Sequence, residues 1–140
     1  MNKKIYNNDL TVYENQLVKE SLIYLKSFIE DMGEFYPFAM VMDKKEIINA
    51  VFPNIEDEFP TTQYLINLYN ETFEKEYSNK ATNYVLSIIC IDVFIHDNIN
   101  HNDVKRNAIE MRFMGINYKK TVQLFYEVDK NNTVIFQEWN

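Results

Sequence analysis

The chain has 140 residues, of which 46% are hydrophobic and 15% aromatic, and its net charge at pH 7 is −7. This composition excludes a disordered chain, which would have few aromatic residues, and the length favours one compact domain over residues 1–140. The negative charge argues against binding to nucleic acid or to an anionic membrane surface, because Lys44–Lys45 and Lys119–Lys120 are isolated pairs and not a basic patch.

Cysteine content and the N-terminal segment predict a cytoplasmic protein. Cys90 is the only cysteine, so no internal disulfide can form, and its apolar run Ser87–Ile91 predicts a buried structural thiol. No apolar stretch follows Lys3 and Lys4, which argues against a secretory signal, and no segment has the roughly 18 apolar residues that span a bilayer. The excess of lysine over arginine, with abundant Asn and Ile, is typical of proteins from AT-rich bacterial genomes.

Residues 11–32 have the pattern of a long amphipathic helix. Thr11 and Glu14, three residues apart, form a capping box at its start, and Gly33 stands where a left-handed residue would end it. Apolar residues then recur at helical spacing and predict a broad buried face. The predicted main row is Leu10, Tyr13, Leu17, Tyr24, Phe28 and Met32, and a flanking row is Val18, Leu22, Leu25 and Ile29.

A β-hairpin and a second helix are predicted next. The apolar runs Phe35–Met42 and Ile47–Phe52 flank the polar turn Asp43–Glu46 and so favour a hairpin. Thr61 or Thr62 can cap a second helix that ends at residues 78–80. Its apolar stripe is Leu65, Leu68, Tyr69, Phe73 and Tyr77.

The rest of the chain predicts a four-stranded run. In residues 82–95, apolar side chains occur at both odd and even positions, which is typical of a central strand covered on both faces. A polar linker is expected over residues 97–103, followed by three alternating strands with turns at residues 115–117 and 129–132. Together the elements predict a single-domain α+β fold: an N-terminal helix, a β-hairpin, a second helix and a four-stranded antiparallel run, with the helices packed on one sheet face.

His96, Asp97 and His101 form the densest group of metal-ligand residue types in the sequence. Imidazole and carboxylate groups suit zinc or a similar ion. No third histidine and no cysteine lies nearby, and an Asn- and Asp-rich stretch is typical of a turn-forming loop. We therefore predict a polar loop there, with no metal and no cofactor.

Asp92 lies between Ile91 and Val93 in the predicted central strand. A carboxylate buried there would have a raised pKa, which is a feature of catalytic groups. Asp92 could equally face outward where the sheet is uncovered, or accept hydrogen bonds from a loop. The sequence contains no glycine-rich phosphate loop and no nucleophile-elbow serine, so no catalytic residue is predicted.

An acidic segment, Glu56, Asp57 and Glu58, lies between Pro53 and Pro60. A solvated loop is its simplest interpretation. The alternative is an acidic docking face that attracts one basic protein partner, with some of the many aromatic side chains as anchors. These three residues are the predicted partner-binding site.

The motif Gly33-Glu34-Phe35-Tyr36-Pro37-Phe38 resembles one in an uncharacterised family of small bacterial proteins. In that family the motif opens a hairpin, and a later strand with an Ala-Ile pattern, here Ala108–Phe113, precedes a closing hairpin. The resemblance implies a helix cap, a turn and packed aromatic side chains. It implies no activity and no ligand.

The leading functional hypothesis is a non-catalytic cytoplasmic protein that binds another protein. By analogy of size and charge, its specific form is an immunity protein that neutralises a basic toxin. Two alternatives stay open: a small-molecule-binding or enzymatic domain with a cleft between helices and sheet, and a homodimeric structural module. A deep polar cleft that holds Asp92 or the two histidines would favour the first alternative, and a flat acidic face with tyrosines would favour a protein partner.

Overall fold

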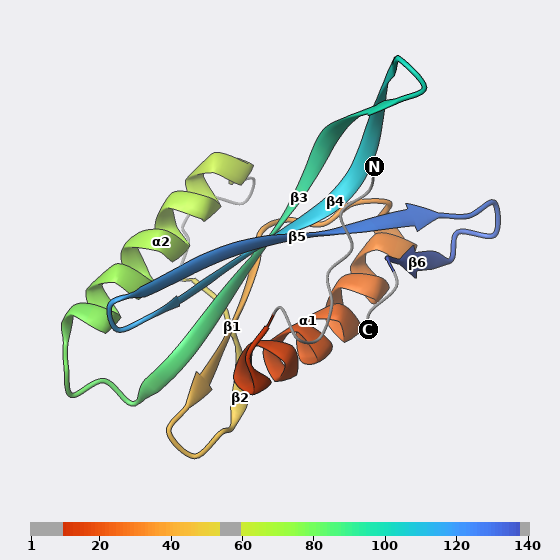
Figure 1. The fold of residues 1–140 in the computed structure, drawn as a ribbon. Helices are drawn as coiled ribbons and strands as arrows, with labels where there is room; N and C mark the ends of the chain where they lie inside the picture. The colour runs from red at the N-terminus through yellow and green to blue at the C-terminus, as the bar shows by residue number, and fades with distance from the viewer. Residues whose placement is uncertain (1–9, 54–59, 138–140) are drawn as a thin grey trace.

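Six strands form one antiparallel sheet that carries two helices (Figure 1). The computed structural model describes residues 10–53 and 60–137, and every element named below lies in them. The predicted α+β fold and its element order are confirmed. The strand order is β2-β1-β3-β4-β5-β6. The elements are α1 (Val12–Met32), β1 (Phe38–Asp43), β2 (Ile48–Val51), α2 (Thr62–Ser78), β3 (Tyr84–Ile99), β4 (Asn102–Gly115), β5 (Tyr118–Val128) and β6 (Val134–Phe136).

Both predicted ends of α1 are confirmed. The Glu14 N–H donates to Thr11 Oγ1 at 3.2 Å, and the Thr11 N–H donates to Glu14 Oε1 at 2.9 Å, so the capping box is complete. Gly33 ends the helix with φ of 78°, and its N–H donates to the Ile29 carbonyl at 2.7 Å. A side chain at this left-handed position would be strained, which explains why a glycine stands here.

The buried face of α1 differs from the predicted one. Tyr24, Phe28 and Met32, from the predicted main row, are 42%, 36% and 77% exposed. Leu10 and Leu17 of the main row are buried as predicted, but further along the helix the flanking row faces the core instead. Two polar residues are buried with them. The buried residues of the helix are Glu14, Leu17, Val18, Ser21, Leu25 and Ile29. Because the helix has apolar residues around most of its circumference, counting them did not identify the core face. Over residues 10–53 and 60–137, no helix is both long and apolar enough to cross a membrane.

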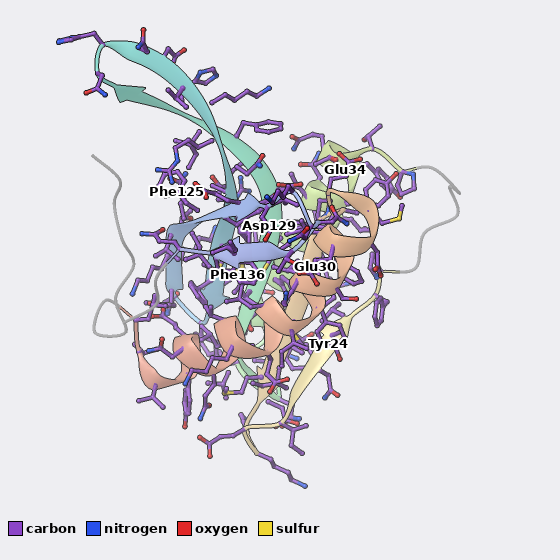
Figure 2. The ribbon with its side chains drawn as sticks, turned by 90° about the vertical axis from the view of Figure 1, so that its right-hand side faces the viewer. Tyr24, Glu30, Glu34, Phe125, Asp129 and Phe136 are labelled. Carbon is purple, nitrogen blue, oxygen red and sulfur yellow. The ribbon has the colours of Figure 1, made fainter. Side chains whose placement is uncertain are left out.

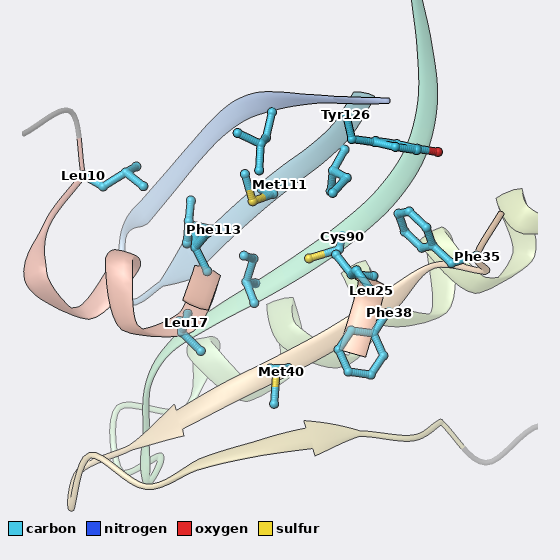
Figure 3. Packing of buried hydrophobic residues seen from close by; sticks show 14 of the residues in the cluster. Leu10, Leu17, Leu25, Phe35, Phe38, Met40, Cys90, Met111, Phe113 and Tyr126 are labelled. Carbon is cyan, nitrogen blue, oxygen red and sulfur yellow. The ribbon is translucent and has the colours of Figure 1, made fainter. Parts of the chain in front are cut away.

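The two helices cover opposite faces of the sheet, so the prediction that both pack on one face was wrong. Met40 and Cys90 belong to the core cluster that includes α1, which Figure 3 shows from close by. Val41 and Ile91 belong to the cluster that includes α2. Because successive side chains of a strand point to opposite faces, β1 and β3 have two apolar faces, and each face needs a cover.

The predicted polar linker at residues 97–103 is part of a long hairpin instead. β3 and β4 pair continuously from Ser87–Met114 out to Ile99–Asn102. The two residues between them, Asn100 and His101, have φ of 52° and 65°, as expected for a two-residue turn between twisted strands. Polar residues suit this end of the hairpin because it projects beyond the body of the molecule (Figure 1).

The β5–β6 hairpin is attached to the C-terminal part of α1. The Val134 N–H donates to the Glu30 carboxylate at 2.8 Å, and the Asn132 side-chain amide donates to the Glu30 carbonyl. Figure 2 shows Glu30 beside the turn that carries Asp129. The predicted turn is confirmed, with Asn132 in the left-handed region at φ of 62°.

Candidate functional site

A pocket of about 500 Å³ lies where the chain passes from α1 into β1. Residues 33–38, the motif that links these two elements, contribute six of its lining residues. Both helices and strands β3, β4 and β5 supply most of the rest. We call this the Asp92 pocket; its other lining residues are Phe28, Met32, Phe52, Thr62, Tyr69, Asp92, Phe94, Asn107 and Tyr126.

Local sequence explains how the motif forms this wall. Gly33 turns the chain out of α1, and Pro37 restricts the backbone just before β1 begins at Phe38. Phe35 and Phe38 are buried, whereas the Tyr36 side chain between them is 62% exposed. The motif therefore packs one set of aromatic rings into the core and leaves another at the mouth of the pocket.

Asp92 and Tyr126 form the polar centre of the pocket. The Tyr126 hydroxyl donates to Asp92 Oδ1 at 2.7 Å, and Figure 3 shows this hydroxyl pointing away from the buried side chains. The Phe35 N–H also donates to the Asp92 carboxylate. Asp92 is half-buried, and of the alternatives left open by the sequence, the acceptance of a hydrogen bond from a loop is met by Phe35, in the segment between α1 and β1.

Burial raises the pKa of Asp92 above its ordinary value. The hydrogen bonds from Tyr126 and Phe35 offset part of this rise, and the negative charge of Glu34 adds to it. Burial, followed by the hydrogen bond to Asp92, also raises the pKa of Tyr126. In the hydrogen bond between them, the Tyr126 phenol donates and Asp92 accepts.

The charge of the pocket is wholly acidic among the residues that the structure describes. Glu34 and Asp92 line it, and no lysine, arginine or histidine does. Figure 2 shows Glu34 at the end of α1. The remaining polar side chains are the hydroxyls of Thr62, Tyr36, Tyr69 and Tyr126 and the amide of Asn107.

Tyr69 connects the two sides of the pocket. Its hydroxyl donates to the Val51 carbonyl at 3.2 Å, which ties α2 to the end of β2. Burial raises the pKa of Tyr69 to about 12, so it stays a neutral donor. Phe52, the next residue after Val51, is 78% exposed at the pocket mouth.

The two histidines that the sequence singled out for a metal lie at different places on the β3–β4 hairpin. His96 lies on β3, where Nδ1 is 3.0 Å from the Asp103 carboxylate across the hairpin. His101 is exposed in the turn, and the side chain of Asp97 lies outside what the structure describes. Among the described residues, no three His, Cys, Asp or Glu side chains cluster as metal ligands would.

The predicted partner-binding residues Glu56, Asp57 and Glu58 lie outside the described residues. The predicted buried thiol is confirmed: Cys90 is fully buried, and burial raises its pKa to about 12. A thiol with such a pKa is almost wholly protonated at neutral pH, and a protonated thiol is a poor nucleophile.

A second carboxylate–tyrosine pair, which the sequence did not reveal, lies at the other end of α1. Glu14 is 1% exposed and accepts hydrogen bonds from the Tyr118 hydroxyl and from Lys120 Nζ, the latter at 3.0 Å. Burial acts to raise the pKa of Glu14, but the hydrogen bonds from Tyr118, Thr11 and Lys120 and the charge of Lys120 outweigh it and lower the pKa. Sequence analysis identified only its capping role, because residues 118–120 are about a hundred positions away.

Sequence reasoning also treated the motif at residues 33–38 as structural and missed that it lines the pocket. Its three aromatic residues around Pro37, namely Phe35, Tyr36 and Phe38, were the signal that could have indicated an aromatic site. No protein-family model matches the chain, and no curated protein and no solved structure is detectably similar to it. The resemblance through Gly33–Phe38 therefore stays untested.

Proposed function

We propose that this protein is a non-catalytic binding protein that takes a small, largely apolar molecule into the Asp92 pocket. This is the first alternative left open by the sequence, and a single observation carries it. A half-buried carboxylate–phenol pair lies in the wall of a pocket of about 500 Å³ that is otherwise mostly aromatic. Small-molecule sites in proteins are typically roughly 300–1,000 Å³, mainly apolar, and oriented by a few polar groups.

The mouth of the pocket supports this proposal. Phe52, Phe94 and Tyr36 are 78%, 59% and 62% exposed, although all three are large aromatic side chains that gain by leaving water. Together with Met32, which is 77% exposed, they line one opening. A ligand that enters here would bury apolar surface that the fold itself leaves in contact with solvent.

The polar lining favours binding over acid–base chemistry. Asp92 is engaged by Tyr126 and by a backbone N–H, and the pKa of Tyr126 is raised. The raised pKa of Tyr126 keeps its hydroxyl protonated near neutral pH, so this hydroxyl is a poor nucleophile although it donates to Asp92. We therefore assign the pair to orientation of the ligand.

A substitution that fills the mouth tests the proposal. Thr62 is exposed at the first turn of α2 and lines the pocket, so Thr62→Trp should obstruct the opening while the core stays intact. We expect monocyclic aromatic fragments to shift the ¹H–¹⁵N NMR signals of residues 33–38 in the wild-type protein and to lose this effect in Thr62→Trp.

The matched control is Gln63→Trp. Gln63 is exposed on the same turn, and its side chain bonds to Asn67 outside the pocket lining. Fragment shifts should persist in this variant. Asn107→Trp, on β4, provides a second obstruction that does not depend on α2. Fragment binding that survives both obstructions, or no shifts at residues 33–38 in the wild type, would overturn the proposal.

The exposed apolar rim also favours a second candidate, the protein-binding hypothesis. A patch of Met32, Tyr36, Phe52 and Phe94 is the type of anchor that partner proteins cover. In this candidate, the protein is a cytoplasmic immunity protein that neutralises one basic toxin, and the acidic residues Glu56, Asp57 and Glu58 attract that toxin.

A pull-down from lysate of the source cells, read by mass spectrometry beside a charge-matched control, tests the second candidate. It predicts one stoichiometric basic partner that is lost when Glu56, Asp57 and Glu58 are changed to Lys. Recovery of the chain alone, or as a homodimer, would contradict it. The two experiments test the two candidate functions independently. Thr62→Trp should abolish fragment binding whether or not the pull-down captures a protein.

A further inference from the structure

The electrostatics of the Asp92 pocket narrow the class of molecule that it can take. Its two ionisable carboxylates, Glu34 and Asp92, face a lining without any described lysine, arginine or histidine. An anion entering the pocket would meet like charge at short range, and a neutral molecule would leave a half-buried carboxylate without a counter-ion.

The aromatic lining also favours a cation as the ligand. The face of an aromatic ring attracts a cation, and this attraction is larger where water is displaced. One ring of the pocket already accepts such a group, because Lys105 Nζ lies 3.9 Å from the centre of the Phe94 ring. Lys105 reaches this ring from β4 and is not among the residues that line the pocket.

The Glu14–Tyr118 pair shows which third group this protein places beside a carboxylate–tyrosine pair that is buried. Glu14 has Tyr118 and, in addition, the ammonium group of Lys120 at 3.0 Å. Asp92 has Tyr126 and the Phe35 N–H, while the nearby charge that acts on it is that of Glu34, which is negative. A ligand cation would take the position at Asp92 that Lys120 takes at Glu14.

We propose that the Asp92 pocket selects a small organic cation, an ammonium or guanidinium group on an aromatic body, with the cationic group against the Asp92 carboxylate and the apolar body against the rings of residues 33–38 and Phe94. This inference rests on the proposed function, because it names the chemical class of the ligand for that same pocket. A small molecule fits better than a macromolecule because a volume of about 500 Å³ lies in the range of small-molecule sites.

Three probes with the same phenyl body separate charge from shape: 2-phenylethylammonium, 2-phenylethanol and phenylacetate. Their dissociation constants are measured by NMR titration at neutral pH on the full chain. We expect the cation to bind about tenfold more tightly than the alcohol, because a charge-assisted hydrogen bond is stronger than a neutral one, and the anion to bind more weakly than both.

Four variants locate the charge effect. Asp92→Asn keeps the shape of the side chain and should reduce the preference for the cation over the alcohol to about threefold or less. Glu34→Gln should reduce it less, because Glu34 is exposed and solvent screens its charge. Glu71→Gln, which removes one exposed charge of α2 outside the pocket, should leave the preference unchanged. Lys105→Met should strengthen binding of the cation, because it removes a competitor from the Phe94 ring.

The outcomes distinguish this inference from the proposed function. If the cation and the alcohol bind equally in the wild type, the pocket binds aryl groups without charge selection, and only the inference fails. A preference that survives Asp92→Asn overturns the inference too. If none of the probes shifts residues 33–38 at millimolar concentration, the inference and the proposed function both fail. Tighter binding of Nα-acetyl-lysine methylamide than of 2-phenylethylammonium would overturn the assignment to a small molecule and indicate a partner's lysine side chain.

Discussion

Glu14 and Asp92 lie in two regions of the molecule that share one arrangement but differ in the charged group beside the carboxylate. In each, a carboxylate accepts a hydrogen bond from a tyrosine of β5, Tyr118 in one region and Tyr126 in the other. Glu14 is 1% exposed and has Lys120 as a counter-ion. Asp92 is half-buried, lies in the wall of a pocket, and has Glu34 nearby. The pKa of Glu14 is lowered, and the pKa of Asp92 is raised.

One carboxylate is enclosed together with a counter-ion, and the other lies in the wall of a pocket without a described cation in its lining. Burial disfavours the charged form in both places, so the sign of each pKa shift depends on which partners are present. At Glu14 the fold supplies a cation, and the ionised form stabilises the native state. At Asp92 the described residues supply a negative neighbour and an opening but no cation, and under the proposal above a ligand would provide the counter-ion.

The largest effect on stability is expected from removing Lys120, the cation beside the buried Glu14–Tyr118 pair. Lys120→Met should lower the free energy of unfolding by about 2 to 3 kcal/mol, because the buried Glu14 carboxylate loses its counter-ion. The loss falls short of that of a fully buried pair because the Lys120 side chain is 30% exposed. Urea unfolding at neutral pH measures it.

Lys119→Met is the matched control for this prediction. Lys119 pairs with Glu74 at 3.2 Å, but both side chains are exposed, at 69% and 59%. Its removal should cost at most about 1 kcal/mol. Equal losses for the two variants would mean that the Glu14 cluster is not a stabilising buried pair.

A pH dependence is expected next, from Glu14→Gln. At neutral pH the variant should be less stable than the wild type by about 2 kcal/mol, since it loses the charge-assisted bond to Lys120. The pKa of Glu14 is lowered from its ordinary value of 4.5, so this advantage of the wild type is present above that value and is lost as the pH falls through the folded-state pKa. Unfolding curves at neutral and acidic pH test this, and a difference that grows with acid would contradict it.

Replacing each tyrosine by phenylalanine compares the two pairs directly. Tyr118→Phe should cost about 1 to 2 kcal/mol, because it leaves the buried Glu14 with one donor fewer. Tyr126→Phe should cost less than about 1 kcal/mol, because water in the pocket can replace the lost donor to Asp92. Thermal and urea unfolding of the two variants give the comparison, and the reverse order would show that Asp92 is the more enclosed carboxylate.

The smallest effect on stability is expected from Asp92→Asn, and its pH dependence should have the opposite sign to that of Glu14→Gln. At neutral pH the variant should lie within about 1 kcal/mol of the wild type, or be more stable, because an unfavourable charge is removed. The pKa of Asp92 is raised from 3.8, so the native state binds a proton more readily than the unfolded chain. The wild type should therefore gain stability relative to Asp92→Asn as the pH falls through the folded-state pKa of Asp92. A relative loss in acid would mean that Asp92 is stabilised as an ion in the native fold.

Local sequence was sufficient to predict the order of the elements and several of their ends. The capping box of Thr11 and Glu14, the left-handed Gly33 and the turn before β6 depend on residues within a few positions of one another, and all are confirmed. Alternation of side chains predicted the late strands for the same reason. The hairpin end at Asn100–His101 was missed because polar residues suit a projecting strand as well as a loop.

The sequence by itself determined that the chain forms an α+β fold with two capped helices and an antiparallel sheet, because helix caps, turns and periodicity act between residues that are near one another in the chain. Only the tertiary structure decided which side of α1 is buried, that the helices take opposite faces, and that Asp92 meets Tyr126 while Glu14 meets Tyr118 and Lys120. These pairings depend on strand register and on how each helix lies on the sheet, which bring together residues that are 34 and 104 positions apart. The Asp92 pocket has the same origin, because its walls come from segments that meet only when the sheet and both helices are in place.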